Sequence, residues 1–350
     1  MKWDFAIGNP PYQEEAPGES TSEKPVYHLF MDACHETAGK TLLVTPARFL
    51  FNAGATPKIW NKKTLNDIHF KVLDYESDAK RIFPNASITG GVAVSYYDTS
   101  QEFVPINVFI PYPELNRIRN KVIDSDGYCA LSTIISGRTP YLFTEAMHKD
   151  YPYASDRLSH GHSMDISSNA FETLPELFEE TKPTDVKEYY RVLGRKNNIR
   201  TYCWIRRKYA KGRTCEMTQT WKVFLPKANG ASGMLCDEPA RLISKPAVGT
   251  PDDIATDTFI CVGAFTTEKE ANAANKYILS KFARCLLGTL KVTQINSKET
   301  WANVPLQDFT DKSDINWNTS IANIDKQLYK KYGLSQEEID FIETHVKEMA

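Results

Sequence analysis

Two adjacent prolines stand directly behind a short apolar run near the start of the chain, and they limit how that run can fold. The run is Phe5-Ala6-Ile7-Gly8, and the segment behind it is Asn9-Pro10-Pro11-Tyr12. A proline donates no backbone hydrogen bond, and the residue before it is held extended. We therefore expect a short buried strand over residues 2–8 that ends at Gly8 and passes into a pre-organised loop.

Segments typical of strands and of helices alternate over the first hundred residues. Apolar spacing predicts helices over 26–38, closing at Gly39, and over about 57–66. Short apolar runs predict strands over 41–44, 70–75 and 91–97, and the polar segment 13–25 predicts a mobile loop. This alternation indicates an α/β fold with a mostly parallel sheet, which binds ligands at the carboxyl ends of its strands. Asn9–Tyr12 and Pro46 both stand at such ends.

The chain changes character after about residue 126. Short runs typical of strands, separated by Gly, Pro and Asn, occur at 202–205, 221–225, 241–243 and 258–262. One apolar stripe predicts a long helix over about 268–287. Ser335-Gln336-Glu337-Glu338 is typical of a capping box that opens a final helix. We therefore expect three parts, with bounds 1–125, 126–310 and 311–350.

Composition excludes several classes of protein. The 350 residues are 41% apolar and 25% charged with a net charge of −2, as in a globular protein without a global basic field. The seven cysteines form no C-x-x-C pair, so we expect reduced thiols and neither a disulfide framework nor a zinc site. His160 and His162 are interpreted as loop histidines, with no metal site. With no leader segment and no run of about 18 apolar residues, we expect a cytoplasmic protein without membrane contact.

The segment Asp4–Tyr12 resembles the catalytic strand and motif of DNA amino-methyltransferases that act on adenine. Thr41–Leu50 and Asp74–Tyr97 are similar to the segments that follow in TaqI-like adenine-specific DNA methyltransferases of bacterial restriction-modification systems. Ser132–Tyr141 and Ile324–Ile342 look like the C-terminal parts of that family. The resemblance implies a partial Rossmann-like methyltransferase sheet over 1–125, a mixed α+β target-recognition domain over 126–310 and C-terminal helices over 311–350.

The resemblance also implies roles for the motif. An adenine amino group is a poor nucleophile that must leave the base stack and needs acceptors for its hydrogens. The side-chain carbonyl of Asn9 and the backbone carbonyl of Pro10 would be those acceptors, and the prolines, including Pro11, would fix their direction. Tyr12 would stack on the extruded base, and Phe83, followed by Pro84, would cover its second face.

One part of the family pattern is missing. Complete members bind S-adenosylmethionine with a Gly-rich turn that precedes the motif, whereas eight residues precede it here and the 17 glycines form no G-x-G. We therefore expect a split or truncated enzyme whose cofactor-binding residues are unknown. The strand before Asn9 would be a sheet edge that pairs with a second chain carrying the cofactor half, or with another copy.

A basic segment interleaved with aromatic residues is the candidate for contact with double-stranded DNA. Residues 191–213 hold nine Lys or Arg and no Asp or Glu. The candidate residues are Arg195, Lys196, Arg200, Trp204, Arg206, Arg207 and Lys208, with Arg138 and Lys222 as weaker ones. The alternative is a solvated strand face whose charge is balanced by the acidic stretch at 172–188.

Two other functions stay open at this point. The chain could be a non-catalytic DNA-binding specificity module of a restriction-modification system that retains the fold. It could also be a methyltransferase acting on planar nitrogens of RNA or protein, although the long second region favours DNA.

Overall fold

The computed structural model describes residues 3–14, 24–85, 88–185, 187–228, 235 and 238–349. The chain forms two compact units, unit 1 (Met1–Pro113) and unit 2 (Glu114–Ala350). The predicted mobile loop over 13–25 lies mostly outside the described residues, apart from the short pair β2 (Gln13–Glu14) and β3 (Lys24–Pro25). The predicted functional divisions at 125 and 310 stay predictions.

Unit 1 is built on a four-stranded sheet in the order β1-β4-β6-β5. Its strands are β1 (Trp3–Gly8), β4 (Ala38–Pro46), β5 (Phe70–Glu76) and β6 (Val92–Asp98). Helix α1 (Tyr27–Thr37) connects β1 to β4, which pair in parallel, as a helical crossover requires. The expected strands and helices are all present, and β4 begins before the predicted residue 41 because α1 ends at Thr37, ahead of Gly39.

The direction of β6 departs from a parallel sheet. β6 pairs antiparallel with both β4 and β5, so β1, β4 and β5 share one direction and β6 is reversed between two of them. The connection from β5 to β6 holds a short 3-10 turn (Ala79–Arg81) and no α-helix in its described residues. A chain that returns to a neighbouring strand without a crossover enters it antiparallel.

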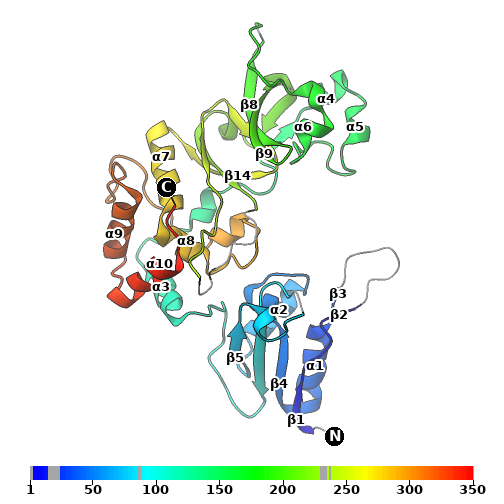
Figure 1. Cartoon of the computed structure of the whole chain (residues 1–350), viewed down its shortest axis with the longest axis vertical. Coiled ribbons are helices and arrows are strands. Elements are labelled where there is room, and N and C mark those ends of the chain that lie inside the picture. The colour runs from blue at the N-terminus through cyan, green and yellow to red at the C-terminus, as the bar shows by residue number, and fades with distance from the viewer. Residues whose placement is uncertain are drawn as a thin grey trace. The chain divides into compact units, whose positions relative to one another are not determined.

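The helices of unit 1 cover one face of the sheet. Apolar side chains of α1 and α2 (Lys58–Leu65) pack in one cluster with Leu43, Phe70 and Ala93 of three strands, and Figure 1 shows both helices against the strands. Phe49 is fully buried in this cluster and contacts the rings of Tyr27 and Trp60. This core fixes the carboxyl ends of β1 and β4, where the predicted site lies.

Strand β1 is one edge of this sheet, as predicted, but the expectation that this strand is buried is wrong, because no strand of the described structure covers its outer side. Trp3, Phe5 and Ile7 are 69%, 64% and 75% exposed. They alternate along β1 and lie beside Ala38, Lys40 and Leu42 of β4, on the face opposite Leu43 and therefore opposite α1 and α2. An apolar strand with a free edge is a template for pairing with another strand.

Unit 2 combines small sheets with helices. Its described strands form the sheets β10-β7, β12-β11-β14 and β13-β8-β9. Their bounds are β7 (Tyr141–Phe143), β8 (Tyr189–Lys196), β9 (Ile199–Arg206), β10 (Ala210–Gly212), β11 (Trp221–Pro226), β12 (Ala247–Gly249), β13 (Asp253–Ala255) and β14 (Phe259–Phe265). The expected strand at 241–243 is wrong: the described structure has no strand over these residues, and Leu242 has a φ of +64°.

The helices of unit 2 are α3 (Pro113–Ile123), α4 (Glu145–Asp150), α5 (Ala154–Arg157), α6 (Ala170–Thr173), α7 (Glu268–Leu279), α8 (Lys281–Leu287), α9 (Ile321–Lys331) and α10 (Gln336–His345). The predicted single helix over 268–287 is two helices. Ser280 between them is extended and caps α8, and the Asp325 carboxylate accepts the N–H groups of Lys281 and Phe282. The predicted capping box at Ser335 is confirmed.

Candidate functional site

The motif Asn9–Tyr12 leaves the sheet at the carboxyl end of β1. β1 and β4 run parallel with Gly8 beside Leu43. The segment after β1 and the end of β4 at Pro46 therefore meet at the same edge of the sheet, the one formed by the carboxyl ends of these two strands. The Tyr12 carbonyl accepts the N–H of Val26 at 3.1 Å, which ties the motif to the start of α1. Asn9 and Pro11 are exposed, and Pro10 is half-buried.

A cavity of about 180 Å³ lies at this edge, within unit 1. Its described lining residues are Tyr12, Gln13, Pro25, Tyr27, Pro46, Arg48, Gly54, Ala55, Ile88 and Thr89. The structure thus brings together Tyr12 and Pro46, the two strand-end positions that the sequence singled out. Asn9, Pro10 and Pro11 precede Tyr12 on the same loop and are not among the lining residues.

Tyr12 is the motif residue that faces this cavity. Its ring is half-buried and packs against the core cluster of unit 1. Its hydroxyl is buried and has no partner at hydrogen-bonding geometry among the described residues. Burial raises the pKa of Tyr12, and the nearby Asn9 side chain partly opposes that shift. A neutral phenol, with the Asn9 side chain near its hydroxyl, therefore lines the cavity.

Sequence reasoning missed Arg48 and Tyr27, which also line the cavity. The Arg48 Nε donates to the Thr89 carbonyl at 2.5 Å. Burial raises the pKa of Tyr27 to about 12, while a hydrogen bond with Thr56 and the charge of Arg48 oppose the shift. The one signal in the sequence is that Arg48 follows the strand-end Pro46 by two residues.

The structure does not bring Phe83 into this cavity. Phe83 is half-buried, and its N–H donates to the Ala79 carbonyl at 2.7 Å. Ile88 and Thr89, later in the same connection, line the cavity in its place. The ring sandwich of Tyr12 and Phe83 therefore stays a prediction that needs a rearrangement of this loop.

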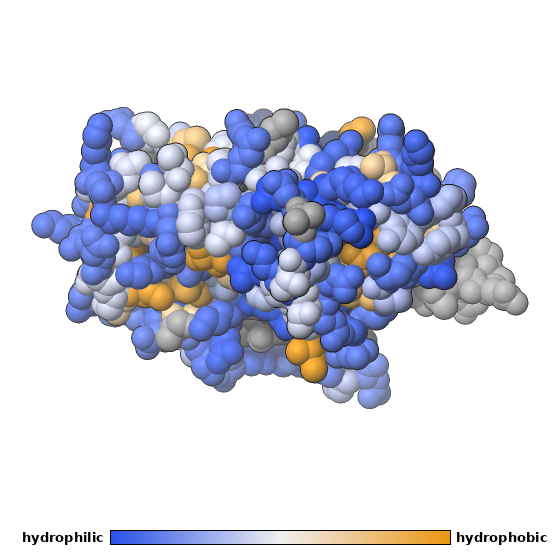
Figure 2. All heavy atoms as spheres, turned by 90° about the horizontal axis from the view of Figure 1, so that it is seen from above, coloured by the Kyte–Doolittle hydropathy of each residue, from blue (hydrophilic) through white to orange (hydrophobic). Residues whose placement is uncertain are grey.

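The candidate DNA contacts of unit 2 lie mainly on the hairpin β8–β9. The strands pair antiparallel through a turn at Asn197 and Asn198, which both have positive φ. The register places one set of side chains on a common face, namely Tyr189, Arg191, the buried Leu193, Arg195, Arg200, Tyr202, Trp204 and Arg206. Hydrophilic residues cover most of the face that Figure 2 shows.

Carboxylates neutralise part of the basic segment. Lys196 pairs with Glu180, Arg207 with Asp252, and Lys208 with Asp150. Arg191 forms a bidentate pair with Asp253, with both distances 2.7 Å. These ion pairs agree in part with the alternative interpretation, in which the basic segment is a solvated strand face whose charge is balanced by acidic residues.

Three arginines of the hairpin face have no carboxylate partner in the described structure. Arg195 donates to the Asn198 carbonyl and Arg200 to the Lys245 carbonyl, and Arg206 lies over the ring of Tyr209. Trp204 is half-buried on the same face. These residues remain the strongest candidates for DNA contact.

Lys222 is not a surface contact. It is fully buried, and its Nζ donates to the carbonyls of Met217, Pro251 and Asp253. Burial lowers its pKa to about 8. The weaker DNA candidate at this position is therefore wrong, because the ammonium is enclosed by backbone acceptors.

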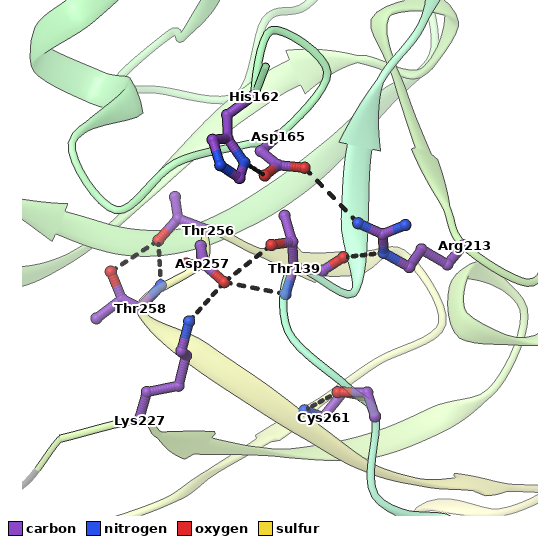
Figure 3. Close-up of polar contacts among 10 residues, drawn as sticks. Thr139, His162, Asp165, Arg213, Lys227, Thr256, Asp257, Thr258 and Cys261 are labelled. Carbon is purple, nitrogen blue, oxygen red and sulfur yellow. Dashed lines mark hydrogen bonds and ion pairs between the residues drawn. The ribbon is translucent and has the colours of Figure 1, made fainter. Parts of the chain in front are cut away.

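Arg138 is exposed, and polar contacts hold the next residue, Thr139 (Figure 3). The next residue, Thr139, has a φ of +51°, which is unusual for a β-branched residue. The Thr139 N–H donates to Asp257 Oδ1 at 2.9 Å, and its carbonyl accepts from Arg213 Nε at 2.7 Å. The backbone beside Arg138 is thus fixed while the Arg138 side chain stays available.

One histidine of the sequence pair, His162, belongs to the same polar network. The His162 Nδ1 lies 2.8 Å from Asp165 Oδ2, and Asp165 also faces Arg213 (Figure 3). Across the described ranges, no group of three or more His, Cys, Asp or Glu is arranged to hold a metal ion. No helix in the described part of the chain is long and apolar enough to span a membrane.

Comparison with known proteins gives one family match. Residues 1–83 match the family described as Eco57I restriction-modification methylase. A search of curated protein sequences found no relative.

Two solved structures show weak likeness. The type IIG restriction endonuclease BpuSI matches at 9% identity and a TM-score of 0.35, over 93% of this chain and 50% of that chain. The type IIL restriction-modification enzyme MmeI, solved with DNA, matches at 12% identity and a TM-score of 0.39, over 98% of this chain and 57% of that chain. This chain spans about half the length of each, and likeness at this level carries no argument about activity.

The family match covers the segment that holds Asn9–Tyr12, Pro46, Arg48 and Phe83. The N-terminal part of this chain is therefore similar to the Eco57I restriction-modification methylase family.

Proposed function

We propose that unit 1 carries the target-base pocket of an adenine-specific DNA methyltransferase that uses S-adenosylmethionine, and that unit 2 binds double-stranded DNA. The observation that carries this proposal is the position of Asn9-Pro10-Pro11-Tyr12. The motif directly follows a strand, at a sheet edge, and its Tyr12 lines a cavity together with Pro46 of the parallel neighbour. The family match over residues 1–83 supports it.

The proposed chemistry uses the motif as a set of acceptors beside a ring. An extruded adenine enters the cavity and stacks on Tyr12. Its amino hydrogens bond to the Asn9 side-chain carbonyl and the Pro10 carbonyl, which keeps electron density on the nitrogen as its new bond forms. Asn9 is exposed and lies near the Tyr12 hydroxyl, so in this proposal its side chain turns from Tyr12 toward the bound base. Phe83 closes on the second face of the base if its loop rearranges.

The cavity does not fit the base and the cofactor together. Sites that enclose drug-sized ligands measure about 300–1,000 Å³, whereas this cavity measures about 180 Å³. We therefore assign no described residue to S-adenosylmethionine. Its site, in this proposal, is completed by a strand that pairs with β1.

The free edge of β1 supports such pairing. Trp3, Phe5 and Ile7 present an apolar face beside unpaired backbone groups. The added strand comes from a second polypeptide that carries the Gly-rich cofactor half, or from another copy of this chain. Replacement of Phe5 by Lys should abolish the association measured by sedimentation, and unchanged association would contradict this role of β1.

DNA contact is assigned to the hairpin face and to Arg138. The arginines without carboxylate partners, Arg195, Arg200 and Arg206, bind phosphates or base edges, with Trp204 beside them. Lys196, Arg207 and Lys208 reach DNA if their exposed ion pairs open, which costs little because such pairs contribute about 0–1 kcal/mol.

The test is transfer of labelled methyl groups from S-adenosylmethionine to DNA of mixed sequence. The intact chain should label adenine, alone or with the partner polypeptide, and Asn9→Ala should remove the label. Asn120→Ala, at an exposed position on α3, is the matched control and should retain it. Labelling that does not depend on Asn9 would refute the proposed pocket.

A second candidate is a specificity module that binds DNA without methyl transfer. It is favoured by the cavity volume, which leaves no room for the cofactor, and by the arginine face of β8–β9. DNA binding without label, under all conditions that include a partner, would select this candidate.

A further inference from the structure

Arg48 is held in one direction at the wall of the cavity. It lies in the 3-10 turn Ala47–Phe51 that follows β4, and its Nε donates to the Thr89 carbonyl. Its stem passes between Gly54 and Gly90, whose φ angles are +80° and +91°. A Cβ at Gly90 would lie 2.8 Å from Arg48 Cγ, and a Cβ at Gly54 would lie 3.2 Å from Arg48 Cδ. Both glycines thus leave the space that the Arg48 stem occupies.

The charge of Arg48 has no counter-ion among the residues that the structure describes. None of the carboxylates in the described ranges forms an ion pair with it, and the described lining of the cavity contains no Asp or Glu. Nε is satisfied by Thr89, which leaves the two terminal nitrogens of the guanidinium as donors. A partly enclosed cation without a partner attracts an anion, and a planar guanidinium binds phosphate through two parallel hydrogen bonds.

Electrostatics decides which part of a nucleotide Arg48 contacts. This step rests on the proposed function. An adenine amino nitrogen gains positive charge as it forms its new bond, so a fixed cation beside it would raise the barrier. The same cation stabilises a phosphate, whose charge is negative throughout.

We infer that Arg48 binds the phosphate of the flipped nucleotide while its base stacks on Tyr12 in the same cavity. Arg48 is then a positioning residue. It holds the nucleotide by its phosphate, and the motif Asn9–Tyr12 contacts the base.

The test measures the dissociation constants of the full chain for adenosine, adenosine 5′-monophosphate and inorganic phosphate by ligand-observed NMR. The wild type should bind the monophosphate roughly tenfold more tightly than adenosine, the size of a charge-assisted hydrogen bond. Arg48→Gln should abolish this preference and leave adenosine binding unchanged. Arg48→Lys should retain part of it, because the charge remains without the planar fork. A wild-type preference in Arg48→Gln would overturn the inference.

A second variant moves Arg48 without removing its charge. Gly90→Ala should also lower the preference for the monophosphate, because the new methyl displaces the Arg48 stem. Gly127→Ala is the matched control, since Gly127 has a φ of +71° and open space around it, and it should keep the wild-type preference. An unchanged preference in Gly90→Ala, at unchanged melting temperature, would count against the fixed geometry.

The same titrations separate this inference from the proposed function. If the monophosphate binds no more tightly than inorganic phosphate, and Arg48→Gln weakens both, the adenine pocket fails while Arg48 remains an anion site. If adenosine binds and Tyr12→Ala weakens it, but no ligand responds to Arg48, the pocket stands and the inference fails.

Discussion

His35 should make the stability of unit 1 depend on pH. Its imidazole stacks on the ring of Tyr97, with centroids 4.0 Å apart and planes 11° apart, and its Nε2 is buried without a partner in the described structure. Burial lowers the pKa of His35 to about 4, which the charges of Asp32 and Asp67 oppose and that of Lys63 reinforces. In the unfolded chain a histidine titrates near its ordinary value of about 6.5.

The sign follows from where the proton binds. Between the two pKa values the unfolded chain holds a proton on His35 that the folded chain lacks, so acid favours unfolding. The contribution is fully present above about pH 6.5 and is lost as the pH falls toward the folded value of about 4. With about 1.4 kcal/mol per pKa unit, the loss reaches about 3 kcal/mol.

His35→Phe keeps a ring against Tyr97 and removes the titration. The free energy of unfolding, from urea titrations between pH 7 and pH 4, should fall more steeply in the wild type than in this variant. The difference between the two curves should change by up to about 3 kcal/mol over that range. His160→Gln, at an exposed loop position, is the control and should follow the wild type. Parallel curves for the wild type and His35→Phe would refute the reasoning.

Two further predictions concern unit 2. Arg206→Ala should weaken DNA binding about equally for all sequences and reduce the slope of log affinity against log salt by about 1, measured by anisotropy; an unchanged slope would exclude a phosphate contact. Asp253→Ala should cost about 1–3 kcal/mol in thermal or urea unfolding, because Asp253 is 1% exposed, while Arg191, which loses its bidentate partner, has a side chain that is 38% exposed and solvated. A loss below about 1 kcal/mol would show that water replaces this pair.

Local signals in the sequence predicted most single elements. Helices α1 and α2 follow from apolar spacing, and α10 follows from its capping box at Ser335. These signals act within a few residues, so no distant partner is needed to specify them.

Features set by distant residues were missed. The helix break at Ser280 depends on Asp325, 45 residues later, whose carboxylate caps α8. The reversed direction of β6 depends on its place between β4 and β5, and apolar content carries no strand direction.

The candidate site likewise combines residues that local sequence signals predicted with one that they did not. Tyr12 and Pro46 were predicted together because both stand at strand ends of one sheet edge. Arg48 was not predicted, because its direction is set by Gly90 and Thr89, which lie about 40 positions later. A basic residue acquires this role through tertiary packing that no local pattern encodes.

The free edge of β1 continues without interruption into Gly8 and Asn9, which makes strand pairing and ligand binding thermodynamically linked. A strand that pairs with β1 restricts the backbone from which the motif departs. If this raises the affinity for a nucleotide by some factor, the nucleotide must raise the affinity of pairing by the same factor. Pairing of a strand with β1 and binding of a nucleotide in the cavity are then reciprocally coupled. The same coupling free energy can be measured from the affinity of either one.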